Sequence, residues 1–518
     1  MLRAAVLTVV CAVLAAAAGG CGEAGAGGAD PSSMVPAGVP IYIEATVRPE
    51  GRQRDDALAA AGKLLGTPDP AAKLRALFDE QLAKDRPGAT WARDVAPWLG
   101  EKVGVWVSGL DQAEPTAAAI IASTDPDAAR AALERLARAG GAGSGSRSYK
   151  GVSYTLTDDK TAVGMVGDWV VSGNETGFRR TVDARDGDHL DGEKRYSDAI
   201  DRLDDDRLGH FYVEPRGLLD AATRQNPSGA AQLGQLKSFV PLDKLGPATG
   251  ALTADGAGIA LETVLADVPE GPLRNLAALS AGGESDVLGD LPGDAWGAFA
   301  SLRFGATLQE LFKSFAGALG GAAITAQVQR ATGLDVQGDL LEWIGDLGGF
   351  VRGTTESTVD GAFVITTRDD ARAASAVGKI AGVLGRQSGT SVKPVALPGA
   401  ESAFEVAETG SSARYYLART EGRVVAAYGK DAAVAALKPA STLADSTAFD
   451  QAEQVLGDGM TPSFLLAMPP VLQLTDAIGG ADADFERARP YLETIAVIAA
   501  GGRFDGADAH SRIAAAFR

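Results

Sequence analysis

Cysteine and histidine are scarce in this chain of 518 residues, and their scarcity excludes several kinds of chemistry. The sequence contains two cysteines, Cys11 and Cys21, and three histidines, His189, His210 and His510. Cys11 lies in a predicted leader peptide that would be cleaved from the chain. The mature chain then has no disulfide, no thiolate zinc site and no cysteine nucleophile. Imidazole metal sites need two or three converging nitrogens, and these histidines are scattered. We therefore expect no metal and no cofactor.

Positive charge is also in short supply. Lys and Arg number 48 against 67 Asp and Glu, which gives a formal net charge of −19 at pH 7. Binding to nucleic acid requires clustered Lys and Arg, and electrostatic adhesion to anionic lipid requires the same. We therefore expect no nucleic-acid partner, and a membrane contact would need a covalent lipid.

Motifs of nucleophilic catalysis are missing as well. The sequence has no Gly-x-Ser-x-Gly elbow and no Ser-x-x-Lys pair that begins a helix. The acidic residues between 201 and 206 are typical of an exposed helix end and turn. Paired carboxylates serve glycoside cleavage only where a pocket sets their pKa values apart. We expect no catalytic residue, with a carboxylate-based hydrolase kept as the third alternative.

A short leader is what the N-terminus does contain. A basic start at Arg3 precedes an apolar run from residue 4 to 18, and Gly19 and Gly20 then lead to Cys21. A membrane-spanning helix needs about 20 apolar residues, so this run is better interpreted as a signal peptide, residues 1–20. Small residues before a cysteine indicate lipidation at Cys21, and simple secretion with cleavage nearby is the alternative. Residues 21–35 are then the lipidated cysteine and a flexible tether.

The rest of the sequence repeats itself with an offset of about 250 residues. Trp98-Leu99-Gly100 returns as Trp343-Ile344-Gly345, and the segment that begins at His210 returns at Phe464. Further pairs occur in the same order along both halves, and each half ends in an Asp-Gly turn signal. We therefore predict two similar units, residues 36–267 and 291–518, joined by a connector at 268–290.

Each predicted unit mixes hairpins with single amphipathic helices. Residues 103–107 alternate as a strand does, and Gly167-Asp168 separates two strand-like runs as a hairpin turn. Residues 129–137 and 373–384 each place apolar side chains on one helical face. This pattern predicts an α+β fold in which each unit is a largely antiparallel sheet with helices packed on one face. Trp98 and Trp343 are expected to lock a helix onto each sheet.

One loop suggests a calcium site. Four of its side chains carry carboxylates close to glycine: Asp186, Asp188, Asp191 and Glu193. The order of an EF-hand loop is not met, because Leu190 stands where an oxygen ligand is needed and no Glu follows at the twelfth position. A solvated acidic loop is the preferred interpretation.

Short motifs resemble a bacterial family catalogued as domain of unknown function 3352. They are Val35-Pro36-Ala37, Tyr42, Trp98-Leu99-Gly100 and the run from Asp125 to Ala129. The resemblance implies an exported, envelope-associated protein without an assigned activity, and it transfers no catalytic residue.

The sequence therefore predicts a non-enzymatic lipoprotein on the outer face of the cytoplasmic membrane, anchored through Cys21. In this interpretation the protein presents a binding face to an envelope partner. A carrier or sensor of an apolar ligand is the first alternative.

Overall fold

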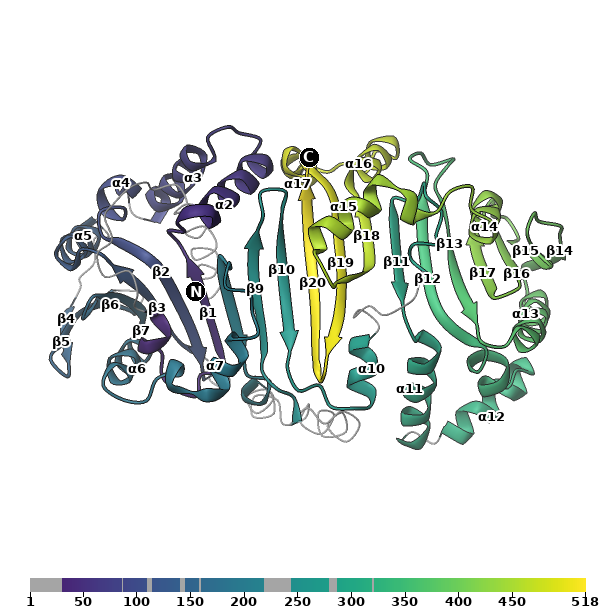
Figure 1. Ribbon diagram of the computed structural model, residues 1–518, viewed down its shortest axis with the longest axis horizontal. Coiled ribbons are helices and arrows are strands. Elements are labelled where there is room, and N and C mark those ends of the chain that lie inside the picture. The colour runs from purple at the N-terminus through teal and green to yellow at the C-terminus, as the bar shows by residue number, and fades with distance from the viewer. Residues whose placement is uncertain are drawn as a thin grey trace. The chain divides into compact units, whose positions relative to one another are not determined.

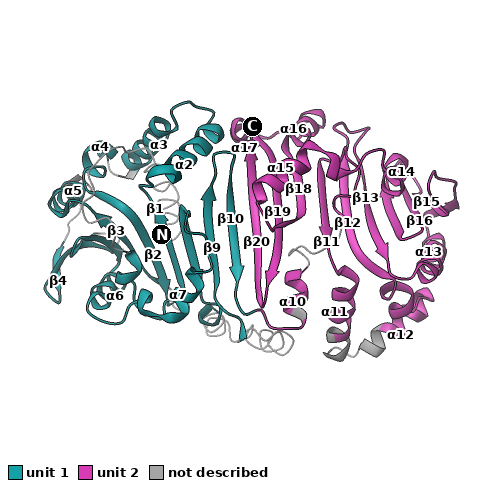
Figure 2. Ribbon diagram, in the orientation of Figure 1, with its two compact units in different colours: residues 1–267 teal, residues 268–518 magenta. Residues whose placement is uncertain are grey.

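The computed structural model describes residues 30–85, 87–109, 114–139, 145–157, 160–218, 244–278, 287–318 and 321–518. The chain divides into two compact units, residues 1–267 and 268–518 (Figure 2). The predicted signal peptide and Cys21 lie outside the described residues. Within the described ranges, no helix has both the length and the apolar character that crossing a membrane requires.

Unit 1 contains ten antiparallel strands in the part that the structure describes. Along the sheet their order is β10-β9-β8-β1-β2-β3-β7-β6-β5-β4. The strands are β1 (Ile41–Thr46), β2 (Leu99–Ser108), β3 (Thr116–Ser123), β4 (Gly145–Tyr149), β5 (Val152–Leu156), β6 (Thr161–Val166), β7 (Trp169–Asn174), β8 (Gly209–Val213), β9 (Ala248–Ala254) and β10 (Gly258–Leu265) (Figure 1).

The described strands of unit 2 pair in the corresponding order, β20-β19-β18-β11-β12-β13-β17-β16-β15-β14, and all pairs are antiparallel. They are β11 (Gly297–Ser301), β12 (Ile344–Arg352), β13 (Asp360–Thr367), β14 (Thr390–Pro394), β15 (Ser402–Glu408), β16 (Arg414–Thr420), β17 (Arg423–Tyr428), β18 (Thr461–Ala467), β19 (Ile495–Asp505) and β20 (Asp508–Phe517). Within each unit, the first strand pairs with the second and the eighth. The predicted α+β class with antiparallel sheets is confirmed.

The helices of unit 1 are α2 (Gly51–Leu65), α3 (Pro70–Asp85), α4 (Trp91–Asp94), α5 (Pro126–Ala139), α6 (Glu175–Arg185) and α7 (Lys194–Ile200), with short 3-10 turns η1 (Pro31–Met34) and η2 (Leu190–Gly192). Those of unit 2 are α10 (Pro272–Ala278), α11 (Phe304–Ala318), α12 (Gly321–Thr332), α13 (Asp370–Gly385), α14 (Lys430–Leu437), α15 (Thr447–Leu456), α16 (Met468–Ala477) and α17 (Ala483–Leu492), with the π-helical η4 (Val336–Leu341) and the 3-10 turn η5 (Leu443–Asp445).

Helices cover both faces of each sheet, so the prediction of helices on one face was wrong. Val170 of β7 packs with Ala129 of α5, whereas its neighbour Val171 packs with Phe178 of α6. Neighbouring residues of a strand point to opposite faces, so α5 and α6 lie on opposite sides. In unit 2, Val424 packs with α13 and its neighbour Val425 packs with α14. These two helices therefore also lie on opposite faces of their sheet. The physical reason is that the central strands are apolar at successive positions.

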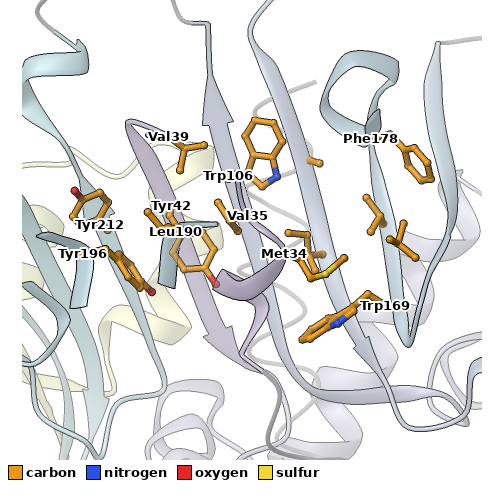
Figure 3. Packing of buried hydrophobic residues seen from close by; sticks show 14 of the residues in the cluster. Met34, Val35, Val39, Tyr42, Trp106, Trp169, Phe178, Leu190, Tyr196 and Tyr212 are labelled. Carbon is orange, nitrogen blue, oxygen red and sulfur yellow. The ribbon is translucent and has the colours of Figure 1, made fainter. Parts of the chain in front are cut away.

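A cluster of aliphatic and aromatic side chains forms the main core of unit 1 (Figure 3). Trp106 is fully buried there, and its indole N–H donates to Thr181 Oγ1 at 3.1 Å. Met34 and Val35 belong to the same core, so the described end of the predicted tether is folded. Asp30 begins this segment by accepting a hydrogen bond from the Ser32 amide at 2.9 Å, which caps η1.

The predicted connector is also part of a folded unit. The boundary between the units falls at residues 267 and 268, and α10 lies within the segment predicted as connector. Arg274 of α10 stacks on the Phe504 ring at 4.5 Å and donates to the Gly506 carbonyl at 2.6 Å. These contacts attach the described part of the segment to the β19–β20 hairpin.

Candidate functional site: an apolar groove on the sheet of unit 2

The carboxylates of the acidic loop do not converge on a common point. Asp186 pairs with Arg185 at 2.6 Å, and Asp191 contacts the His189 ring. Glu193 accepts a hydrogen bond from the Gly38 amide at 2.8 Å. The arginine beside Asp186 lowers the pKa of that carboxyl. Within the described ranges, no group of three or more potential ligands is placed to hold a metal ion.

The backbone of this loop instead joins the segment that precedes β1. Pro36 forms a bridge with His189, and the Leu190 amide donates to the Val35 carbonyl at 2.9 Å. In unit 2, Pro292 forms the corresponding bridge with Thr442, and Leu443 donates to Leu291 at 2.6 Å. The loop therefore has a structural role, to which its backbone and the Glu193 carboxylate both contribute.

The three histidines lie on different elements of the structure. His210 is buried on β8, where the Tyr196 hydroxyl lies 3.1 Å from its Nε2. Burial lowers the pKa of His210 to about 3, so its imidazole is neutral at physiological pH. His510 is buried on β20, and His189 is half-exposed. Strand register also corrects one predicted match: Phe211, not His210, occupies the position of Phe464, because each pairs with the third residue of its unit's first strand.

A buried polar cluster in unit 1 was missed by the sequence analysis. Glu44 is only 4% exposed, accepts a hydrogen bond from the Tyr42 hydroxyl at 2.7 Å, and pairs with Lys102 at 2.9 Å. Lys102 also pairs with Asp30 at 3.4 Å. Burial, followed by the charge of Asp30, raises the pKa of Glu44 to about 7. Although burial opposes it, the contacts with Glu44 and Lys102 hold the pKa of Asp30 at about 2.

This cluster separates two carboxyl pKa values, as acid–base catalysis requires. Its residues, however, line neither of the two cavities described below. Through Lys102, the cluster holds Asp30, the first residue that the structure describes, against β2 and Glu44 of β1. The acidic run is exposed, and there Asp206 pairs with Arg52.

An apolar groove of about 870 Å³ lies on one face of the unit 2 sheet. Its lining follows two cross-strand ladders on the same face of six strands, from β18 through β11, β12, β13 and β17 to β16. One ladder is Phe464, Phe299, Gly349, Phe363, Ala426 and Leu417, and the next is Leu466, Gly297, Val351, Gly361, Tyr428 and Tyr415. Ile380 and Leu384 of α13 contribute to the lining.

Large side chains of the groove are open to solvent. Phe363 is 54% exposed, Tyr428 45% and Tyr415 43%. The rings of Tyr415 and Tyr428 lie 5.7 Å apart, and those of Phe299 and Phe363 meet edge to face at 6.2 Å. Contiguous exposed apolar surface of this kind is typical of sites that bind a protein, a membrane or a ligand.

Glycine makes the hollow possible. Gly297 has open space beside it, because an added Cβ would meet only Leu466 Cδ1, at 3.7 Å. Gly349 receives the ring of Phe299, which a side chain there would displace. The strand order of unit 1 places Ile41 and Val105 at the corresponding positions, and Ala119 at the position of Phe363. Unit 1 therefore has branched side chains at the two positions where unit 2 has Gly297 and Gly349, which we call the glycine floor of the groove.

A polar pocket of about 550 Å³ adjoins the groove. It shares Val359, Asp360 and Tyr428 with the groove lining. Arg352 donates to both oxygens of Asp360, at 2.7 and 3.1 Å, and also pairs with Asp294 at 3.1 Å. The other charged residues of the pocket are Glu356, Arg414, Lys430 and Asp431.

The sequence analysis did not identify the groove. Its residues are spread from Trp296 to Leu466, and only the strand register brings them to one face. The available signal was weak: glycines alternate with large apolar residues near 297–299 and 361–363, which is typical of a strand with one uneven face.

Comparison with solved structures returns three crystal forms of TP0453. Form I is 13% identical and covers 48% of this chain and 84% of that chain, with a TM-score of 0.28. Form III is 14% identical, covers 50% and 90%, and has a TM-score of 0.27; form IV is 12% identical, covers 46% and 81%, and has a TM-score of 0.26. No curated protein matches the sequence. A sequence model described as Protein of unknown function (DUF3352) matches residues 57–491, and the chain belongs to this family.

Proposed function

We propose that this protein is a non-enzymatic lipoprotein that binds an apolar ligand in the groove of unit 2. The proposed location is the outer face of the cytoplasmic membrane, with a lipid on Cys21 as the anchor. An apolar ligand in such a place would come from the membrane itself. We therefore favour a carrier or sensor of an apolar ligand over a protein that presents a binding face to an envelope partner.

The volume and chemistry of the groove carry the proposal. Pockets for small molecules measure about 300–1,000 Å³ and are lined mainly by apolar and aromatic side chains. The groove measures about 870 Å³ and is lined almost entirely by such side chains and by glycine. A rigid protein surface would need complementary bulk to enter a hollow of this kind, whereas a flexible hydrocarbon fills it directly.

Native mass spectrometry of the full chain, extracted gently from its own membranes, tests this function. We expect the wild-type protein to retain a non-covalent apolar molecule. Gly297→Ile introduces into the groove the isoleucine that unit 1 carries at the corresponding position, Ile41. A Cβ at residue 297 meets no atom closer than 3.7 Å. This variant should lose the bound molecule while keeping its melting temperature.

Ala131→Leu is the matched control, because it adds similar apolar bulk at an exposed position of α5 in unit 1. It should retain the ligand as the wild type does. The proposal is wrong if wild-type protein carries no adduct after incubation with vesicles of total membrane lipid, or if Gly297→Ile retains the adduct unchanged.

A further inference from the structure

We infer that the ligand is a zwitterionic phospholipid of the phosphatidylethanolamine class, with its acyl chains in the groove and its headgroup in the adjoining polar pocket. This inference rests on the proposed function of the groove and adds the class of ligand. The first observation is continuity. Val359, Asp360 and Tyr428 line both cavities, so a single molecule reaches from the apolar surface to the charged one. An amphiphile is the class of molecule that matches this division.

Two cationic side chains of the pocket are available for a phosphate. The Arg414 guanidinium donates to the carbonyls of Ser411 and Ala413, each at 2.9 Å. Lys430 is exposed at the first position of α14. No carboxylate among the described residues forms an ion pair with either side chain. Arg352 differs, because Asp360 and Asp294 already neutralise its charge.

The start of α14 strengthens this preference for an anion. Gly429 precedes the helix and supplies no side-chain cap, and residues 429–431 line the pocket. Amide N–H groups at the start of a helix lack intrahelical partners and favour a phosphate or another anion. The Gly429 amide already donates to the Arg414 carbonyl at 3.0 Å, so the donors on this side of the pocket are the amides that follow it in α14 and the side chains of Lys430 and Arg414.

Carboxylates of the same pocket favour a headgroup that carries a primary ammonium as well as the phosphate. Glu356 and Asp431 line it, are exposed, and have no ion-pair partner among the described residues. They disfavour a purely anionic headgroup by repulsion and accept hydrogen bonds from a primary ammonium. A phosphate joined to an ammonium by a short linker satisfies both sets of charges. Ethanolamine phospholipid has this chemistry, whereas phosphatidylglycerol lacks the ammonium.

Competition between lipids with identical acyl chains tests the inference. The full chain is incubated in detergent micelles that contain equimolar phosphatidylethanolamine, phosphatidylglycerol and diacylglycerol, and bound lipid is identified by native mass spectrometry. We expect phosphatidylethanolamine to exceed diacylglycerol by roughly tenfold or more, because diacylglycerol lacks the phosphate and the ammonium that form charge-assisted hydrogen bonds. Arg414→Gln with Lys430→Gln should bring the two lipids to equal occupancy without loss of diacylglycerol.

Lys73→Gln with Arg75→Gln is the matched control, since it removes two exposed charges from α3 of unit 1. This pair should leave the preference unchanged. Equal binding of phosphatidylethanolamine and diacylglycerol by wild-type protein would overturn the headgroup inference and leave the proposed function standing. Preference for phosphatidylglycerol would overturn the assignment of a zwitterionic headgroup. Absence of every lipid, diacylglycerol included, would overturn the proposed function itself.

Discussion

At the scale of single residues, Glu44 makes the stability of unit 1 depend on pH. Burial raises the pKa of this carboxyl from 4.5 to about 7. Between these values the folded chain holds a proton that the unfolded chain has released, so stability falls as the pH rises through this window. We predict that Glu44→Gln, which does not titrate, removes up to about 3 kcal/mol of that fall. Urea unfolding at roughly pH 5 and pH 8 measures the difference.

Glu114→Gln is the control for this prediction, because Glu114 is an exposed carboxylic acid of the same unit. Its pH profile should follow that of the wild type. The interpretation fails if Glu44→Gln loses as much stability between the two pH values as the wild type does. Asp30 does not confuse the result, since its contribution is lost only as the pH falls from 3.8 towards about 2.

The role of a single residue could be predicted from the sequence only where that role depends on residues nearby in the chain. Buried tryptophans and capped helices follow from neighbouring residues. The contact between Lys102 and Glu44 does not, because it requires β1 and β2 to pair in one particular register. The groove is of the same kind: Gly297 and Gly361 are ordinary strand glycines until Val351 is known to lie between them.

At the scale of secondary-structure elements, Trp98 and Trp343 lock corresponding helices in corresponding ways. Both are buried, and both indole N–H groups donate to the carbonyl four residues earlier, that of Asp94 at 2.7 Å and that of Asp339 at 2.9 Å. Trp98 packs with Ala129 of α5. Trp343 packs with the apolar side of α13. The predicted role of the repeated tryptophan is therefore supported by its surroundings.

Truncation of either tryptophan should be costly for its own unit. We predict that Trp98→Ala and Trp343→Ala each lower the free energy of unfolding by about 3–5 kcal/mol, as expected for a large buried aromatic residue. Denaturant unfolding of the purified variants measures this loss. Trp→Phe at the same positions keeps most of the apolar contact and serves as the comparison. A change below about 1 kcal/mol for Trp→Ala would contradict the role assigned to these residues.

The placement of helices was harder to predict than their existence. The apolar periodicity of residues 129–137 and 373–384 indicated the helices correctly. It did not indicate which face of the sheet each helix covers, since that depends on the path of the connecting chain. Successive valines, as at 170 and 171, were the local sign that both faces are buried.

At the scale of the whole molecule, the two units share a strand order and differ in their surfaces. When the strands of each unit are numbered from one to ten along the chain, their order across the sheet is the same in both units. We infer that the units descend from one duplicated ancestor. The polar cluster around Glu44 has no counterpart at Ala300, which takes its position in unit 2. The glycine floor of the groove has no counterpart at Ile41. At these positions unit 1 carries Glu44 and Ile41 where unit 2 carries Ala300 and Gly297.

The proposed attachment to the membrane also belongs to the scale of the whole molecule. We propose that a lipid on Cys21 provides it, since this cysteine follows an apolar run and two small residues, and the net charge of −19 opposes electrostatic adhesion to anionic lipid. We predict that Cys21→Ser moves the protein from the membrane pellet to the soluble fraction and leaves its melting temperature unchanged. Fractionation after a high-salt wash measures this shift. Cys11→Ser, a change within the predicted leader, should leave the protein in the pellet. If Cys21→Ser protein still sediments with membranes after the wash, the lipid is not the anchor, and the exposed aromatic groove of unit 2 becomes the surface to test next.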